Sequence, residues 1–499
     1  MAPYGGDKKD PRVTGEMLHS YLHTYAETHD LLRRIKFNTF VIDATKTSTG
    51  WRLRFKDSKD TVETNKLMVA TGVTSIPSMP DLRQTGDRIP LIHSRDLGES
   101  FLKLQNETVQ TVTVVGAGKS ANDAVYLLLK MGKKVNWLIR EEGTGPLAII
   151  PFKILGLVNS ISFASTRLTS FLSPSILNCE GTLSWMFHRT SLGRWCVGRL
   201  WEFLDFVSQK HAGYSSSDHI QRLKPGIERQ AIFWSHSGLG VVTSPDFWKT
   251  LHKGRISIIR DEVIEVKNKS VLLKSGQAVA TDYIVMCTGW GDHFSMFSQH
   301  DKSKIGLPHS RSVTDESGID WDIYDAMAND EVDKKLPFLA KPPALAFEVP
   351  LSSEYQCKWR LYRRVVPIGL DALTTRSLAI LGQIHTVQTP LVAEIQSLWA
   401  ILYLEGEIAL PSPEEMAKEV SLWNAWTRKR YLGQGQKIPY SLYDFLPYID
   451  VLFKDMKLQS RRKSNPLSDF FTPYSPADFA GFVDEYLARR PETSRSAAT

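Results

Sequence analysis

One short segment combines residue types that could bind the phosphates of a dinucleotide. It follows the apolar run 111–115 and opens a helical run at residues 122–130. In this GxGxxA motif Gly116 permits a tight turn, Gly118 lets a pyrophosphate approach the backbone, and Ala121 lets helix and strand pack closely. The helix start adds unpaired N–H groups and the positive end of the helix dipole. The predicted phosphate-binding residues are Gly116, Gly118, Lys119, Ser120 and Ala121.

The residue after the next apolar run predicts which dinucleotide binds. Residues 135–139 form a second predicted strand, and Arg140 follows it. An acidic residue there would accept hydrogen bonds from the ribose of NAD, whereas an arginine favours the 2′-phosphate of NADP. Arg140 therefore predicts NADPH, with Lys119 as a second cation. The alternative is that Arg140 is only an exposed residue at the end of a strand.

Two distant stretches share one pattern, in which a short strand and a meander precede an apolar strand that ends in Thr-Gly. The closing pairs are Thr71–Gly72 and Thr288–Gly289. Continuous apolar strands are typical of parallel strands covered on both faces. The repetition predicts two related α/β domains, preceded by a helix within residues 10–32 that Thr14 caps. The strands expected in the two copies are residues 34–39, 51–55 and 66–72, and residues 255–259, 270–273 and 283–289.

Composition excludes several classes of protein. The 499 residues carry a net charge of only +7, which does not favour nucleic-acid binding. The densest basic run, residues 461–463, is expected to be a solvated tail. Residues 1–8 lack the apolar core of a signal peptide, so the expected location is the cytoplasm. The four cysteines are Cys179, Cys196, Cys287 and Cys357, and no two of them have CxxC spacing. This disfavours a zinc site or a redox disulfide, and it fits a reducing compartment.

The segment 143–238 is rich in bulky apolar residues. They predict a helical insertion whose apolar side chains form a core, cover an apolar substrate, or touch a membrane surface. Its most apolar part, residues 146–164, is interrupted by polar residues, so we expect a helical flap or a membrane-surface contact rather than a membrane span. We expect no metal site here, because the nearest candidates, His211, Asp218 and His219, are typical of a polar loop.

The motifs together resemble the class B flavin-dependent monooxygenases, which include the flavin-containing and Baeyer–Villiger enzymes, and most of all the forms of fungal secondary metabolism. The matching segments are residues 70–72, 116–121, 287–290 and 381–390. The resemblance implies two Rossmann-like domains with β-meanders, one for FAD and one for NADPH. It puts Gln388 and Thr389 near the flavin ring, and the two Thr-Gly pairs on the FAD side or at the domain junction. The implied boundaries are an FAD-binding domain in two parts, residues 1–105 and 291–455, an NADPH-binding domain at 106–290, and a tail at 456–499.

The resemblance also implies a reaction. NADPH would reduce the flavin, and a flavin C4a-(hydro)peroxide formed with O2 would transfer one oxygen atom to a small apolar metabolite. No GxGxxG precedes Thr71, although the family has one there for FAD, and His93 alone remains of a family histidine segment. His93 is therefore either a weak catalytic candidate or a structural histidine. The alternative function is a truncated, FAD-deficient relative that only binds NADPH or is inactive.

Overall fold

The structure is a computed structural model that describes residues 13–227, 229–242, 244–310, 312–345 and 359–489. Gly5, Gly6 and Cys357 lie outside the described residues. The chain divides into two units, Met1–Thr64 and Asn65–Thr499. The domain boundaries expected at residues 105, 290 and 455 stay predictions.

The first unit holds a helix and a meander. Thr14 caps α1 (Gly15–Thr28) by accepting a hydrogen bond from the Met17 N–H at 3.2 Å, which confirms the predicted helix. The strand expected at residues 34–39 is wrong, because Asn38 has a φ of 53° and interrupts an extended chain. Three later strands instead pair antiparallel in the order β1-β2-β3. The bounds are η1 (Leu32–Arg34), β1 (Val41–Lys46), β2 (Trp51–Phe55) and β3 (Thr61–Thr64).

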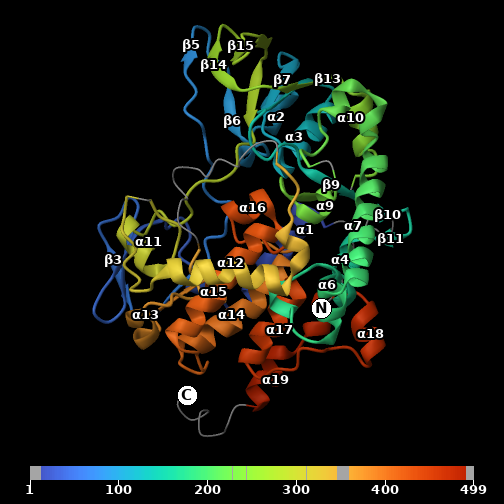
Figure 1. The fold of residues 1–499 in the computed structure, drawn as a ribbon. Coiled ribbons are helices and arrows are strands. Elements are labelled where there is room, and N and C mark those ends of the chain that lie inside the picture. Colours follow the sequence, from blue (N-terminus) through green and yellow to red (C-terminus); the bar gives the residue numbers. More distant parts are fainter. Residues whose placement is uncertain (1–12, 228, 243, 311, 346–358, 490–499) are drawn as a thin grey trace. The chain divides into compact units, whose positions relative to one another are not determined.

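A five-stranded parallel sheet forms one part of the second unit (Figure 1). Its order, β13-β8-β7-β17-β6, confirms the predicted strand–turn–helix–strand segment, with α3 joining β7 to β8. The helices α3 and α10 pack against each other beside it. The bounds are β6 (Leu91–His93), β7 (Thr111–Val115), α3 (Lys119–Lys130), β8 (Lys134–Ile139), α10 (Phe247–Lys253), β13 (Ile256–Arg260) and β17 (Tyr283–Met286).

A second meander confirms the predicted repeat. Strands β14, β15 and β16 pair antiparallel, as β1, β2 and β3 do in the first unit. Strand β5 pairs parallel with β14 at the edge of this sheet. They lead into the buried strand β17, as β1–β3 lead into β4. Their bounds are β5 (Gln84–Thr85), β14 (Val263–Lys267), β15 (Ser270–Leu273) and β16 (Ala278–Ala280).

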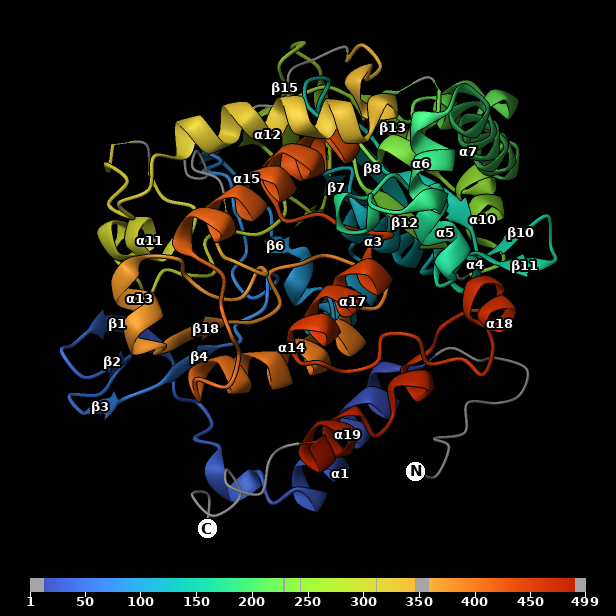
Figure 2. The same cartoon turned by 60° about the horizontal axis from the view of Figure 1, so that its bottom comes forward.

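A smaller parallel pair, β4 and β18, packs against α14 of the C-terminal helices (Figure 2). The core here is rich in large aromatic residues, among them the fully buried Trp399 and Trp426. The elements are β4 (Leu67–Val69), β18 (Leu378–Ile380), α14 (Thr389–Leu404), α15 (Pro413–Arg430), α16 (Leu432–Lys437) and α17 (Phe445–Asp455).

The insertion is helical only in part. Residues 146–159, expected as a helical flap, instead form short strands, because the β-branched Ile149 and Ile150 precede Pro151 and lie buried in β9 beside β12. Helices follow from residue 160 onward. The elements are β9 (Ala148–Pro151), β10 (Lys153–Ile154), β11 (Val158–Asn159), α4 (Ser160–Ala164), α5 (Arg167–Leu172), η3 (Ile176–Asn178), α6 (Thr182–Arg189), α7 (Ser191–Ala212), η4 (Tyr214–Ser216), α8 (Asp218–Gln221), α9 (Ala231–Trp234) and β12 (Leu239–Val242). Of the helices within the described ranges, none has the length and apolar character to cross a bilayer.

The basic run near the C-terminus is not a solvated tail. The Arg462 guanidinium pairs with Glu485 at 2.5 Å and the Lys463 ammonium with Asp478 at 2.6 Å, and both side chains are more than four-fifths buried. The solvated-tail expectation was wrong because these acidic partners lie on later short helices. The remaining elements are η2 (Ser94–Asp96), α2 (Phe101–Gln105), α11 (Gln299–Ile305), α12 (Trp321–Lys335), η5 (Pro337–Ala340), α13 (Leu370–Thr375), α18 (Pro466–Phe471), η6 (Pro476–Phe479) and α19 (Phe482–Arg489).

Candidate functional site

The GxGxxA turn lies where the strand order of the five-stranded sheet reverses. Strand β7 has β8, its successor through α3, on one side and the much later β17 on the other. In open parallel sheets, ligands bind at such a switch point, outside the carboxyl ends of the strands. Gly116 follows β7 with a φ of 129°, and a Cβ there would lie 2.3 Å from the carbonyl oxygen of Cys287. Only glycine fits this position.

The residues after Gly116 leave space for a phosphate. A Cβ on Gly118 would meet no heavy atom within 4 Å, so the backbone there is open to a ligand. Lys119 and Ser120 are exposed in the first turn of α3, where N–H groups have no acceptor within the helix. Ala121 is fully buried against the sheet, which brings helix and strand close together. The five predicted residues thus lie in one continuous turn whose geometry suits an anion, and their role in binding stays a prediction.

Arg140 lies at the carboxyl end of β8 and is exposed. The following loop folds back onto it, because Gly143 has a φ of 107° and a Cβ there would lie 2.9 Å from Arg140 Nε. On the neighbouring strand β13, Arg260 Nη2 donates a 3.4 Å hydrogen bond to the carbonyl oxygen of Glu141. Among the described residues, no hydrogen-bond acceptor or acid pairs with the Arg140 guanidinium, which leaves it free for a ligand. Lys119, the predicted second cation, pairs instead with Asp123 one turn further along α3.

A second opening lies at the carboxyl ends of β4 and β18. Gly72 follows β4 and Gly382 follows β18, with φ values of 69° and 77°, and a Cβ on either would meet no heavy atom within 4 Å. Thr71 is exposed beside Gly72, and its hydroxyl donates a 3.4 Å hydrogen bond to the His293 carbonyl oxygen. These glycines leave the backbone open to a flat group that approaches closely.

Helix α14 packs against β18. Gln388 is its N-cap residue and Thr389 its first residue. The helix is held against β18 by Gln396, whose side-chain oxygen accepts a 3.1 Å hydrogen bond from the Gly382 N–H. Gln396 Nε2 donates a 2.6 Å hydrogen bond to the hydroxyl of Tyr448. No role was predicted for Gln396 or for Gly382, which lies in the matching segment 381–390, although a glutamine on a mostly apolar helix was a usable signal.

The two Thr-Gly pairs end strands of different sheets, and the segments after them meet. Ser78 N–H donates to the Gly289 carbonyl oxygen at 3.0 Å, and the Thr288 hydroxyl donates to the Ser78 carbonyl oxygen at 2.6 Å. Pro77 and Trp290 form an antiparallel bridge. Two short antiparallel segments therefore link the five-stranded sheet to the β4–β18 pair.

His93 lies at this link, at the end of β6. Its Nδ1 accepts a 3.2 Å hydrogen bond from the Arg95 N–H, and its ring meets the Trp290 ring edge-on at 4.9 Å. Burial lowers the pKa of His93, which favours the neutral form of the ring. These contacts give His93 a packing role at the domain link, and its catalytic role stays a prediction.

The insertion reaches the N-terminus of α14. Gln388 Nε2 donates a 3.2 Å hydrogen bond to the Ser165 hydroxyl, and the Tyr474 N–H donates a 2.8 Å bond to the Ser165 carbonyl oxygen. Ser165, the residue after α4, therefore contacts both Gln388, which is expected near the flavin ring, and the C-terminal segment.

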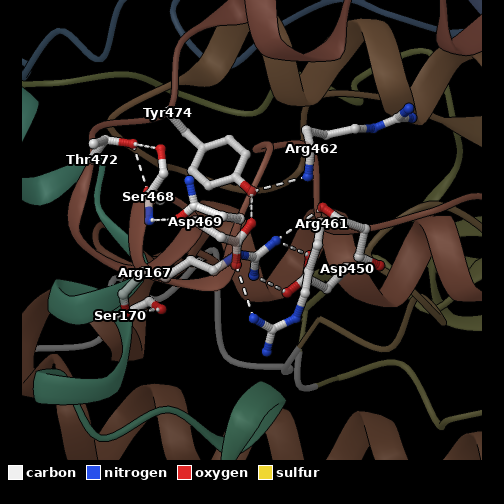
Figure 3. Close-up of polar contacts among 11 residues, drawn as sticks. Arg167, Ser170, Asp450, Arg461, Arg462, Ser468, Asp469, Thr472 and Tyr474 are labelled. Atoms are coloured by element: carbon white, nitrogen blue, oxygen red, sulfur yellow. Dashed lines mark hydrogen bonds and ion pairs between the residues drawn. The ribbon is translucent and has the colours of Figure 1, made fainter.

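Arg167 joins the insertion to the C-terminal segment (Figure 3). Its guanidinium donates to both carboxylate oxygens of Asp450, at 2.6 and 3.0 Å, and pairs with Asp469 at 3.1 Å. The Tyr474 hydroxyl donates to Asp469. A cavity of about 380 Å³ opens beside Arg167 and Asp450. Asp450 and Asp469 already neutralise the charge of Arg167. We therefore assign this network a structural role, in which it joins the insertion to the C-terminal segment.

Other kinds of site find little support among the described residues. No group of three or more His, Cys, Asp or Glu side chains within them could hold a metal ion. The thiols of Cys179, Cys196 and Cys287 are free, and burial raises the pKa of Cys287 to about 12, which makes its thiol unreactive.

Comparisons with known proteins agree with this arrangement. Residues 6–148 match the family described as pyridine nucleotide-disulphide oxidoreductase. The fold resembles that of a cyclohexanone monooxygenase variant from Rhodococcus sp. Phi1 bound to NADP+, with a TM-score of 0.54 and 15% identity over 89% of this chain and 82% of that chain. This likeness confirms the predicted α/β fold with two dinucleotide-binding domains.

Two fungal proteins are more similar in sequence. FAD-dependent monooxygenase DEP4 of Fusarium langsethiae is 37% identical over 485 residues, which cover 96% of this chain and 83% of the relative. FAD-dependent monooxygenase rstn6 of Aspergillus nomiae is 35% identical over 502 residues, covering 96% of this chain and 86% of the relative. With this identity over nearly its whole length, the chain belongs to the FAD-dependent monooxygenases, within the class B flavin-dependent monooxygenases.

Proposed function

We propose that the protein uses NADPH and FAD to transfer one oxygen atom of O2 to a small apolar metabolite, in fungal secondary-metabolite biosynthesis. The observation that carries this proposal is a pair of open backbone edges, at Gly118 and at Gly72 with Gly382, on sheets joined by two short paired segments. The fungal relatives support the biosynthetic setting.

The residues present fit both cofactors. The turn Gly116–Gly118 and the start of α3 would hold the pyrophosphate of NADPH, and Arg140 its 2′-phosphate. The open glycines Gly72 and Gly382 and the N-terminus of α14 would hold the flavin ring. Bound FAD supplies two-electron transfer from NADPH and activation of O2. In the overall reaction one substrate molecule, O2, NADPH and a proton would give the oxygenated substrate, water and NADP+.

The chain's own contribution is to orient the reactants and exclude water. Gln388 and Ser165 join α14 to the insertion, so α4 would lie beside a flavin bound at the N-terminus of α14. Helix α4 carries half-buried apolar residues, Ile161 and Phe163, which would help to exclude water there. A dry, covered site protects a reactive intermediate from water and suits an apolar substrate.

The proposal is tested with purified protein reconstituted with FAD. We expect the absorption of protein-bound oxidised flavin, and NADPH oxidation with O2 uptake that depends on added FAD. NADH at the same concentration should give a much slower reaction. Binding of NADP+ without flavin retention or O2 uptake would contradict the proposal and favour the alternative, a protein that only binds NADPH.

We also propose a cytoplasmic location with peripheral membrane contact through the insertion. Its free thiols Cys179 and Cys196 support a reducing compartment. Large apolar side chains are exposed on α6, α7 and the β10–β11 hairpin, which in Figure 1 projects on the side of α7. They include Leu157 (82% exposed), Leu192 (71%), Trp195 (59%) and Trp185 (54%).

Cations lie on the same elements as these apolar side chains. The Arg199 guanidinium lies over the Trp195 ring, 5.9 Å from its centroid, and Lys153, Arg189 and Lys210 are also exposed. Tryptophans beside basic side chains suit the headgroup region of an anionic membrane.

Replacing Trp185 and Trp195 together by serine is expected to lower binding to phosphatidylcholine vesicles containing phosphatidylserine by about fivefold or more. Co-sedimentation measures this. The matched control replaces Leu467 and Phe471, which are equally exposed on α18, and should bind as the wild type does. Equal loss in both double variants, or no vesicle binding by the wild type, would contradict the membrane contact.

A further inference from the structure

A lysine from the C-terminal part of the chain lies on a helix that packs against the loop after Arg140. Lys437 ends α16 and is half-buried. Burial and the positive charge of Arg140 lower the pKa of Lys437 to about 8. Within the described ranges, neither side chain has a hydrogen-bond acceptor or an acid as its partner. Lys437 therefore lies within electrostatic reach of Arg140, and in the described part of the chain neither cation is paired with an anion.

The position of α16 is fixed by close backbone packing on the loop after Arg140. A Cβ on Gly433 would lie 2.6 Å from Thr144 Cγ2 and 2.8 Å from the carbonyl oxygen of His236. The Gly433 N–H donates a 3.1 Å hydrogen bond to His236 Nδ1. Only a glycine lets the helix approach so closely, so Lys437 is held beside the loop rather than reaching it on a flexible segment.

A purely structural role explains this arrangement poorly. A lysine in the last turn of a helix stabilises the helix dipole, but it does so best when its ammonium is in water. Lys437 instead gives up part of its hydration and faces a charge of its own sign, and both effects disfavour its charged form. An anion bound between Lys437 and Arg140 would remove both costs.

We propose that Lys437 and Arg140 together bind the 2′-phosphate of the dinucleotide, so that α16 helps determine the preference for NADPH over NADH. The proposal rests on the NADPH-binding function proposed above. A phosphomonoester carries close to two negative charges at pH 7. The planar guanidinium of Arg140 is suited to two of its oxygens, and the Lys437 ammonium to the third.

The test measures binding of 2′,5′-ADP and of 5′-AMP, which lacks the 2′-phosphate, by isothermal titration calorimetry. We expect Lys437→Ala to weaken 2′,5′-ADP about tenfold or more and to change 5′-AMP less than about twofold. Arg140→Ala should act in the same way, and Lys437→Arg should restore most of the affinity. Gln436→Ala, an exposed neighbour on the same helix, is the matched control and should bind as the wild type does.

The outcomes separate this proposal from the function on which it rests. If Arg140→Ala weakens 2′,5′-ADP and Lys437→Ala does not, the role of Lys437 is wrong and the NADPH site stands. If the wild type binds 2′,5′-ADP no better than 5′-AMP, the NADPH preference itself fails. Circular dichroism checks folding, and Lys437→Met, which keeps the length of the side chain, replaces the alanine variant if that one unfolds.

Discussion

Gly116→Ala is expected to abolish NADP+ binding and to lower the free energy of unfolding by about 2–4 kcal/mol. The new Cβ would lie 2.3 Å from the carbonyl oxygen of Cys287, a backbone atom at the end of β17 that cannot rotate away. The φ of 129° at this position is also one that alanine rarely adopts. Both effects push β7 and β17 apart at the point where the dinucleotide would bind.

Gly118→Ala distinguishes a binding defect from a folding defect. A Cβ there meets no heavy atom within 4 Å and the φ is −81°, so the free energy of unfolding should change by less than about 1 kcal/mol. NADP+ affinity should nevertheless fall strongly, because the methyl group occupies the space of the pyrophosphate. Chemical denaturation and calorimetry measure the two quantities. Unchanged NADP+ affinity in Gly118→Ala would show that the dinucleotide binds elsewhere.

Arg430→Ala is expected to cost about 3–5 kcal/mol of the free energy of unfolding. Arg430 ends α15 and is fully buried. Its guanidinium donates to the carbonyl oxygen of Phe233 and, at 3.1 Å, to the Ser173 hydroxyl, and it lies 3.8 Å from the centroid of the Phe233 ring. It therefore joins the insertion to the C-terminal helices. Its removal would leave these acceptors and the buried carboxyl of Asp444 without a cation.

The neighbouring cation gives the control. Lys429 pairs with Asp333 at 2.6 Å on a more accessible part of α15, so Lys429→Ala should cost less than about 1 kcal/mol. Urea denaturation compares the two variants. Because α16 follows directly after Arg430, we also expect Arg430→Ala to weaken 2′,5′-ADP. Similar losses of stability in both variants would contradict the central role of Arg430.

Local signals predicted the nucleotide-binding half of the site. The residues from Thr111 to Ile139 specify strand, turn, helix and strand by themselves. The apolar strands, the amphipathic helix and the three small residues of the turn all lie within this one short segment. The repeated Thr-Gly endings likewise predicted two meanders and a parallel strand after each, and the second meander was found at β14–β16. Such features depend on backbone conformation and short-range packing.

Long-range partners explain where the predictions failed. The run at residues 461–463 is polar in any local window, and only the folded chain brings Glu485 and Asp478 to Arg462 and Lys463. Residues 146–159 are apolar enough for a helix, but β9 gains β12 as a partner and forms a strand instead. Neither partner could be read from the neighbouring sequence.

Motifs and charge pattern already indicated the family and predicted a dinucleotide turn at Gly116 and a cation at Arg140, because the conformational freedom of glycine and the charge of arginine are properties of single residues. The packing of α16 on the loop after Arg140, and the contact of Ser165 in the insertion with Gln388, became visible in the folded chain alone. Those contacts join segments hundreds of residues apart, and their geometry depends on the packing of the whole C-terminal core rather than on any local pattern.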